Sequence, residues 1–306
     1  MLTEMTKRTE RCGAGSNEEM IQPFVIALPP LIWVLLAFAL RPHVPAWGFM
    51  WVLAYAVFLS CKWISVAPVL HRMRGRLLVM YMITDPGMDA GPYLKSPKRR
   101  AISKSEVVLG LVRAIVGAAL AFVVAPRVSS PVSGLAALFG LVLTLHFGVL
   151  HLVSLVLQYL RRSTKPLMNH PLRSLSLTEL WSQRWNTGFS DLARNLIFRP
   201  VARRAGAAVA TGAVFVASGL VHDLVISLPA GGGYGLPTVY FGIQFLGILI
   251  ERTTAGRTVR RRWPMVARAF TVLIALTPLP LLFHGAFLQN VILPFVRAVG
   301  LPGGAS

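Results

Sequence analysis

Long apolar stretches recur along the chain and constrain its fold more than any other feature. A helix needs about 20 apolar residues to cross the roughly 30 Å of hydrocarbon in a bilayer. Six such stretches lie near residues 23–40, 47–67, 105–125, 132–160, 205–228 and 236–251. A seventh region, at 265–300, is too long for one span and is broken by TPLPLLFHG, which predicts one span plus a re-entrant or interfacial piece. The pattern predicts an all-α polytopic membrane protein with about 7–8 transmembrane helices.

The positions of the basic residues predict the topology. The chain has 31 basic and 11 acidic residues, and three loops hold 23 of the basic ones: eight in 71–104, nine in 161–204 and six in 252–268. By the positive-inside rule these loops face the cytoplasm, and so does the amino terminus. This placement favours contacts with the headgroups of membrane lipids and does not indicate nucleic acid as a partner. Arginine outnumbers lysine 25 to 6, typical of a GC-rich coding sequence, which predicts a bacterial inner-membrane protein.

We expect one membrane-embedded domain over residues 23–300, with a polar cytoplasmic leader at 1–22 and a short tail at 301–306. Cys12 lies in the leader and Cys61 in an apolar stretch, so neither a disulfide nor a cysteine-based zinc site is expected. His146 and His151 share one apolar stretch, but their spacing fits one helical face poorly and no carboxylate accompanies them. The sequence predicts no metal site, and we interpret these two histidines as packing residues.

One cytoplasmic segment, SLSLTELWSQRWNTGFSDLARNLIFRP at 174–200, is too polar to cross a bilayer and too regular for a linker. Ser176 and Glu179 fit a capping box at the start of a helix, and Pro200 is expected to end it. Apolar side chains recur every three or four residues, at Leu177, Trp181, Trp185, Phe189, Leu192 and Leu196. The spacing predicts an amphipathic interfacial helix with its tryptophan pair anchored at the headgroups. Such a helix can also serve only to connect two spans.

A histidine lies inside the fifth apolar stretch, in ASGLVHDLVISLP at 217–229. An ionisable side chain within a membrane helix costs about 2.5 kcal/mol or more, and is therefore a functional candidate by default. A neutral imidazole has one acceptor nitrogen and can take a proton from a hydroxyl, so His222 is a candidate general base. Ser218, four residues earlier on the same face, can select its tautomer. Asp223 points about 100° away around the helix, so the pair is not a dyad.

Two other interpretations of His222 remain open. The side chain can lie near the outer end of its span, where the interface wets it. It can also act as a proton relay in a transporter or channel. A relay predicts further acids in the membrane, and besides Asp223 only Glu106 and Glu251 come near span ends.

The motif set resembles the wax synthase branch of the membrane-bound O-acyltransferases. The resemblance rests on SLTELWSQRWN followed by FRP, then SGLVHD with its histidine 36 residues after Asn186, and on DPGMDAGPYL at 85–94. It covers roughly residues 80–300. Leu180 stands where the branch usually has Phe, Ser182-Gln183 where it has Gly-Arg, and Gly91 where it has Arg. These departures bear on the substrate more than on the reaction.

The resemblance implies transfer of a fatty acyl group from a thioester, usually acyl-CoA, to the hydroxyl of a lipophilic alcohol. It implies His222 as general base and Asn186 as its assistant, with no metal or cofactor beyond acyl-CoA as co-substrate. Other residues expected to bind substrate are Trp181, Trp185, Ser218, Arg184, Arg194 and Arg199, the three arginines through the phosphates of the acyl donor. At 1.5 Å per residue, His222 lies roughly 25 Å from the cytoplasmic end of a straight helix. We therefore expect the Trp-Asn segment to dip inward and a polar tunnel to join Asn186 to His222.

Overall fold

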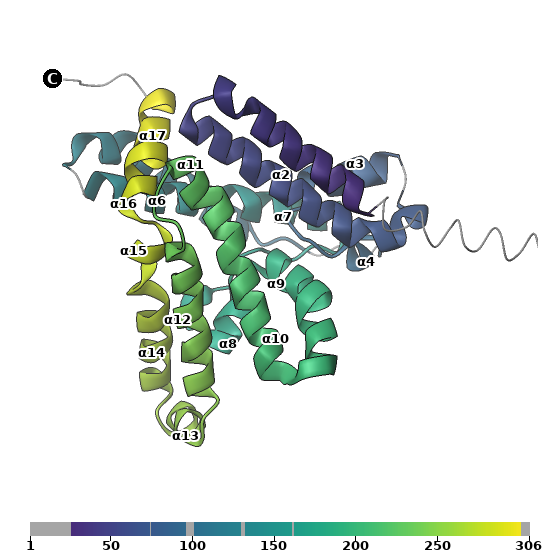
Figure 1. The fold of residues 1–306 in the computed structure, drawn as a ribbon, viewed down its shortest axis with the longest axis vertical. Coiled ribbons are helices and arrows are strands. Elements are labelled where there is room, and N and C mark those ends of the chain that lie inside the picture. Colours follow the sequence, from purple (N-terminus) through teal and green to yellow (C-terminus); the bar gives the residue numbers. More distant parts are fainter. Residues whose placement is uncertain (1–25, 74, 96–100, 130–131, 161, 301–306) are drawn as a thin grey trace, which may run out of the picture.

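The computed structural model describes residues 26–300, apart from 74, 96–100, 130–131 and 161, so the predicted leader and tail lie outside the described residues. The elements of this part are helices joined by loops, which confirms the all-α prediction (Figure 1). Six helices are long and apolar enough to cross a membrane. They are Ile26–His43; Ala46–Arg72, with α2 (Ala46–Val66); Lys104–Arg127, with α5 (Lys104–Ala119); Val132–Tyr159, with α6 (Val132–Val142) and α7 (Leu150–Tyr159); Thr187–Ala230, with α9 (Thr187–Ala193), α10 (Arg199–His222) and α11 (Leu228–Ala230); and Pro264–Leu282, with α14 (Pro264–Leu276) and α15 (Leu279–Leu282).

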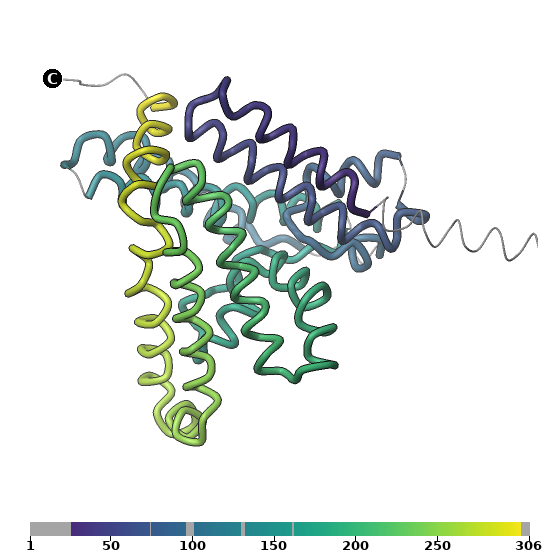
Figure 2. The backbone as a smooth tube through the Cα atoms, viewed as in Figure 1, coloured from purple at the N-terminus to yellow at the C-terminus, as the bar shows by residue number. Residues whose placement is uncertain are grey.

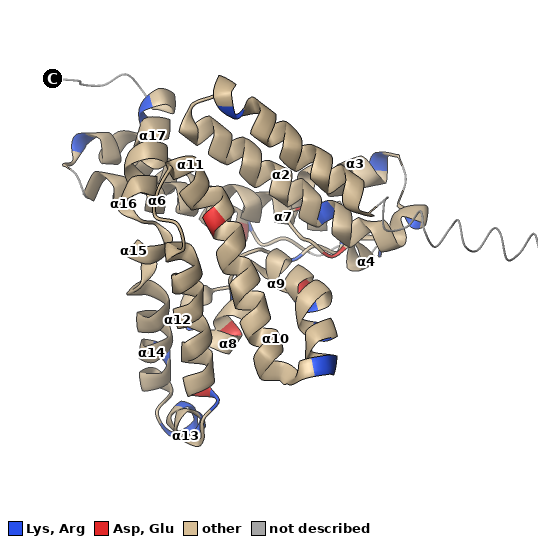
Figure 3. Cartoon of the chain, in the orientation of Figure 1, with Lys and Arg blue, Asp and Glu red and all other residues tan. Residues whose placement is uncertain are grey.

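The predicted sixth stretch forms a shorter helix, α12 (Leu236–Glu251), whose 16 residues rise about 24 Å. The basic helix α13 (Thr254–Arg262) connects α12 to α14, and Figure 2 shows these two helices as a hairpin with α13 at its tip. Figure 3 shows Lys and Arg concentrated at that tip. The chain breaks at Pro278 and again at His284, after which α16 (Gly285–Phe287), a π-helical turn and α17 (Leu293–Val299) form one helix. This agrees with the predicted interruption of the 265–300 region.

The predicted end of the helix at Pro200 is not where the chain turns, because the turn lies inside α10. Pro200 does not end a helix: it is the second residue of α10, which continues without a break from the π-helical turn Arg194–Phe198. The chain instead reverses at Gly206, whose φ of 83° and ψ of 166° are non-helical and accessible to glycine alone without strain. Figure 1 shows the resulting antiparallel arrangement of the segment after α9 and the main part of α10.

The interfacial helix predicted over 176–199 is not continuous. It consists of α8 (Leu177–Glu179), a π-helical turn at Leu180–Arg184, a break, and then α9. Ser176 caps α8 as predicted, because its hydroxyl accepts from the Glu179 N–H at 3.0 Å. A buried carboxylate from another helix also holds this end: Glu251 accepts from the N–H of Leu177 at 2.6 Å. The segment is therefore docked into the protein at its start and does not lie on its surface there.

Helices α5 and α6–α7 approach closely because small residues face each other. A Cβ added at Gly117 would lie 2.7 Å from the carbonyl oxygen of Gly140, and one at Gly148 would lie 2.7 Å from the Cβ of Ala114. Small residues of this kind let membrane helices pack backbone to backbone. Between α6 and α7 the helix widens into a π-helical stretch, Leu143–Val149, a distortion frequent at functional sites. This stretch carries His146.

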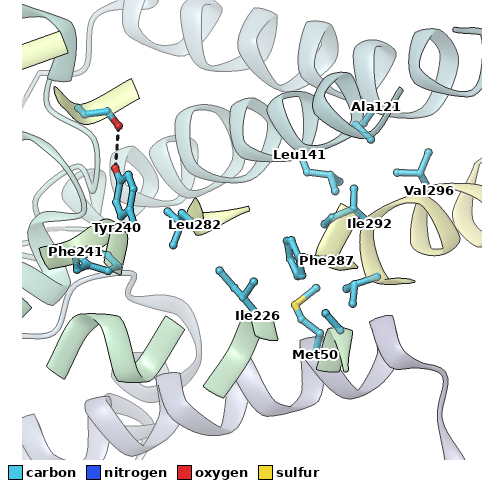
Figure 4. Close-up of a cluster of buried hydrophobic side chains, with 14 of the residues drawn as sticks. Met50, Ala121, Leu141, Ile226, Tyr240, Phe241, Leu282, Phe287, Ile292 and Val296 are labelled. Atoms are coloured by element: carbon cyan, nitrogen blue, oxygen red, sulfur yellow. Dashed lines mark hydrogen bonds between the residues drawn. The ribbon is translucent and has the colours of Figure 1, made fainter. Parts of the chain in front are cut away.

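The largest buried cluster joins helices from both ends of the chain. Figure 4 shows Met50 of α2, Leu141 of α6 and Ile226 after α10 near Phe287 and Ile292 from the carboxyl-terminal segment. The outward faces remain apolar, with Ile115 67% exposed and Phe139 62% exposed. Exposed apolar faces of this extent fit helices that are surrounded by lipid.

Candidate active site

His222 ends the regular part of α10, and its surroundings define its tautomer. Its Nδ1 lies 2.7 Å from the backbone carbonyl oxygen of Ser218. A carbonyl oxygen only accepts, so Nδ1 carries the proton and Nε2 of the neutral ring keeps its lone pair. The ring packs on Phe241 of α12, with 4.7 Å between centroids. Ser218 thus contacts the imidazole through its backbone and not through its hydroxyl.

The neighbouring Asp223 belongs to a different set of contacts. It accepts hydrogen bonds from the hydroxyl of Ser227 at 3.0 Å and from the N–H of Gly235 at 2.7 Å, and Thr238 donates to its second oxygen. These bonds hold the loop that connects α11 to α12. Asp223 therefore has a structural explanation of its own, in agreement with the interpretation that it does not form a dyad with His222.

The two tryptophans of the Trp-Asn segment are half-buried and pack against other aromatic side chains of the protein. Trp181 packs against Phe215 of α10 at 6.1 Å and against Phe241 of α12 at 5.8 Å between ring centroids. Its indole N–H donates to the side-chain oxygen of Gln244 at 3.3 Å. Trp185 follows, 6.3 Å from Trp181. An unbroken series of ring contacts therefore leads from His222 through Phe241 and Trp181 to the residue before Asn186.

Asn186 has an unusual backbone with a local cause. Its φ of 45° and ψ of 59° are left-handed, a conformation that asparagine tolerates better than most residues. Its side-chain oxygen accepts from the N–H of Phe189 at 3.5 Å and caps α9. The turn at Asn186 thus changes the direction of the chain between the π-helical turn Leu180–Arg184 and α9. The carboxamide NH₂ group remains as a donor.

A cavity of about 160 Å³ lies beside Asn186, and its lining differs from the expected one. Its polar lining residues are Thr84, Asp85, His146 and Asn186, and the others are apolar. His222 does not line it. His146, interpreted from the sequence as a packing residue, has a buried Nδ1 with no hydrogen-bond partner among the described residues. The rule that singled out His222, an ionisable residue inside a membrane helix, applies equally to His146.

The floor of the cavity comes from the 85–94 segment and is held by a buried ion pair. Lys62 of α2 is completely buried, and its ammonium group lies 3.4 Å from the carboxylate of Asp85. It also donates to the carbonyl oxygens of Asp85 and Gly87, at 2.9 and 2.6 Å. Gly188 at the start of α9 approaches this floor, since an added Cβ would lie 3.0 Å from the carbonyl oxygen of Pro86.

The three arginines expected to bind phosphates differ in their exposure and in their hydrogen-bond partners within the protein. Arg184 donates to Glu179 at 2.7 Å and to the carbonyl oxygen of Asn169 at 3.3 Å. Burial favours the neutral acid, but hydrogen bonds from the Leu175 N–H and from Arg184 hold the pKa of the Glu179 carboxyl below its usual value. Arg184 therefore serves an internal ion pair. Arg194 and Arg199 are exposed, and Arg199 bonds to Asn195 at 2.8 Å.

No group of three metal-ligating side chains occurs within the described residues.

Residues 164–241, which are 78 of the 306 residues, match the model of the membrane bound O-acyl transferase family. The matched segment contains the tryptophan pair, Asn186 and His222. No curated protein matches the chain.

Proposed function

We propose that this protein is a membrane-bound O-acyltransferase that moves a fatty acyl group from an acyl thioester, acyl-CoA in the first instance, to the hydroxyl of a lipophilic alcohol, as wax synthases do. The family match over 164–241 carries the proposal, because both proposed catalytic residues lie within it. The free lone pair on Nε2 of His222 supports it, since a general base needs an unprotonated acceptor nitrogen.

In the proposed reaction, Nε2 of His222 takes the hydroxyl proton while the alcohol oxygen bonds to the thioester carbonyl carbon. The carbonyl oxygen becomes an oxyanion, to which the NH₂ group of Asn186 donates. The carbon–sulfur bond then breaks, and the leaving thiolate takes the proton from the imidazolium. An ester and a free thiol result, and the base is restored. Surrounding apolar side chains exclude water, which would otherwise hydrolyse the thioester.

The two residues must act on one substrate although the described cavity contains only Asn186. The ring series Phe241–Trp181–Trp185 joins their surroundings, and we propose that the reacting lipids lie along these rings.

The proposed function is tested by incubating purified protein with labelled acyl-CoA and a panel of acceptors that contains a long-chain alcohol, a sterol and a diacylglycerol. We expect a labelled ester with the long-chain alcohol. The absence of ester with every acceptor contradicts the proposal.

Asn186→Asp is expected to lower kcat about 10²-fold, because aspartate keeps the capping oxygen but loses the oxyanion donor. The change separates chemistry from folding, so the melting temperature in a fixed detergent is measured beside kcat. His170→Gly is a matched control, since His170 and Asn186 are the non-glycine residues with positive φ among those described. An Asn186→Asp variant with unchanged kcat removes Asn186 from the mechanism.

Arg194 and Arg199 are proposed to contact the phosphates of the acyl donor. We expect joint replacement by glutamine to raise KM for acyl-CoA about tenfold at low salt, from two exposed contacts of up to about 1 kcal/mol each. The difference shrinks with added salt, which screens exposed charges. Replacing Arg41 and Arg127, which lie outside the three basic loops predicted to face the cytoplasm, is the control. Equal KM values for the variant and the wild type count against a donor site at these arginines.

A further inference from the structure

Thr187, the residue after Asn186, ties the left-handed turn to an earlier segment of the chain. Its backbone N–H donates to the carbonyl oxygen of Leu167 at 3.0 Å, and its hydroxyl donates to the carbonyl oxygen of Pro166 at 2.9 Å. Residues 164–167 lie outside any helix, so their own place in the fold depends on contacts made by side chains and loops. The position of the Asn186 carboxamide therefore depends on what holds this segment.

A second segment packs against the same turn. A Cβ added at Gly188, two residues after Asn186, would lie 3.0 Å from the carbonyl oxygen of Pro86 and 3.4 Å from the Cα of Gly87. Glycine at this position lets the two backbones approach each other directly. Residues 85–87 also lie outside any helix. Two irregular segments thus hold the turn from neighbouring positions.

The side chain of Asp85 joins these two segments. One of its carboxylate oxygens accepts from the hydroxyl of Thr164 at 2.6 Å, and the other lies 3.4 Å from the ammonium group of Lys62. Lys62 is completely buried in α2 and also donates to the carbonyl oxygen of Gly87 at 2.6 Å. A hydrogen bond to a carboxylate is about twice as strong as one between neutral groups. One buried carboxylate therefore fixes both segments to each other and to α2.

We propose that Asp85 and Thr164 are positioning residues, which hold the carboxamide of Asn186 where the oxyanion forms. The inference rests on the proposed acyl transfer, in which Asn186 supplies the donor. Such a donor acts at about 2.7–3.1 Å from the developing charge, and a displacement of about 1 Å can lower the rate about 10²-fold. Neither positioning residue needs to touch a substrate, because the Thr164 hydroxyl and the Asp85 carboxylate already bond to each other.

The first test compares two substitutions of Thr164 in the full-length protein in a fixed detergent. Thr164→Val keeps the shape of the side chain and removes the hydroxyl, whereas Thr164→Ser keeps the hydroxyl. For ester formation from labelled acyl-CoA and a long-chain alcohol, we expect Thr164→Val to lower kcat about tenfold with both KM values unchanged, and Thr164→Ser to restore most of the rate. Thr164→Ala replaces Thr164→Val if that variant does not fold. Thr258→Val is the matched control, because the Thr258 hydroxyl donates only within its own helix, to the carbonyl oxygen of Thr254.

The second test repeats Thr164→Val in the Asn186→Asp protein. A positioning residue acts through the group that it positions, so its loss should lower kcat less than about twofold once that group is gone. A general loss of folded protein would instead lower kcat by the same factor in both backgrounds. Equal factors in the two backgrounds, or an unchanged kcat in Thr164→Val, overturn the inference.

The side-chain amide NMR signals of asparagine-labelled protein separate this inference from the proposed function, because they need no turnover. The Asn186 signals are assigned by their loss in Asn186→Asp. We expect them to shift in Thr164→Val and to return toward their wild-type positions in Thr164→Ser. These shifts in a protein without transferase activity leave the positioning standing and remove the proposed function. Unmoved Asn186 signals in a protein with full transferase activity overturn the positioning alone.

Discussion

A His222→Gln variant is expected to transfer acyl groups about 10²- to 10⁴-fold more slowly than the wild-type chain, with KM for both substrates nearly unchanged. Positioned general-base catalysis contributes a factor of this size. Glutamine is polar and of similar reach, so it preserves packing on Phe241 but cannot take a proton. The measurement is kcat for ester formation from labelled acyl-CoA and a long-chain alcohol, at saturating acceptor.

Two further measurements complete this test: the pH dependence of the transfer rate, and the rate of a control variant at a second histidine, His151. The wild-type rate should fall at acid pH as the imidazole becomes protonated, and the residual rate of His222→Gln should lack this acid limb. His151→Gln should retain the wild-type rate and profile. A His222→Gln variant within threefold of the wild type shows that the ring is not the base. A proton flux that depends on His222 without ester formation favours the transporter interpretation.

A Lys62→Met variant is expected to lose about 3–5 kcal/mol of stability, the largest structural effect that we predict. Lys62 is 0% exposed and Asp85 only 3%, so removal of the ammonium leaves a carboxylate unpaired inside the protein. Two backbone carbonyl oxygens also lose their donor. Equilibrium unfolding in mixed detergent micelles measures the change.

The chain offers an exposed ion pair as the control. Lys165 lies 3.2 Å from Asp191 with 70% of its side chain exposed, and Lys165→Met should cost less than about 1 kcal/mol. Adding Asp85→Asn to Lys62→Met should restore part of the loss, since the unpaired charge is then gone. Equal stabilities for Lys62→Met and Lys165→Met contradict this role of the buried pair.

Much of the helix pattern follows from residue order. In hydrocarbon every backbone N–H and C=O must bond within its own segment, so a long apolar stretch has little alternative to a helix. The stretches predicted at 47–67 and 105–125 accordingly fall inside Ala46–Arg72 and Lys104–Arg127, and the stretch predicted at 132–160 matches Val132–Tyr159 to within one residue. The apolar stretch at 236–251 forms a helix of only 16 residues, and the carboxylate of its last residue, Glu251, accepts a hydrogen bond from the N–H of Leu177 in α8.

Local signals were less reliable where packing competes with them. The apolar spacing of Leu177, Trp181 and Trp185 predicts one helical face, yet the helix is interrupted at Asn186. Trp181 packs against Phe215 of α10 and Phe241 of α12, and the left-handed Asn186 turns the chain into α9. The same spacing would suit a surface helix, so periodicity cannot distinguish the two arrangements.

His222 can be picked out as a candidate from residue order alone, because a histidine within an apolar run is costly wherever the run packs. The choice of its proton-bearing nitrogen required the folded helix, which brings Nδ1 to the Ser218 carbonyl. The sequence alone does not predict that Asn186 and His146 line the same cavity. These residues are 40 positions apart and share no motif, and the cavity between them exists because α2, the 85–94 segment, α7 and α9 converge there. Hydropathy acts along one segment at a time, whereas a cavity is a property of several segments packed together.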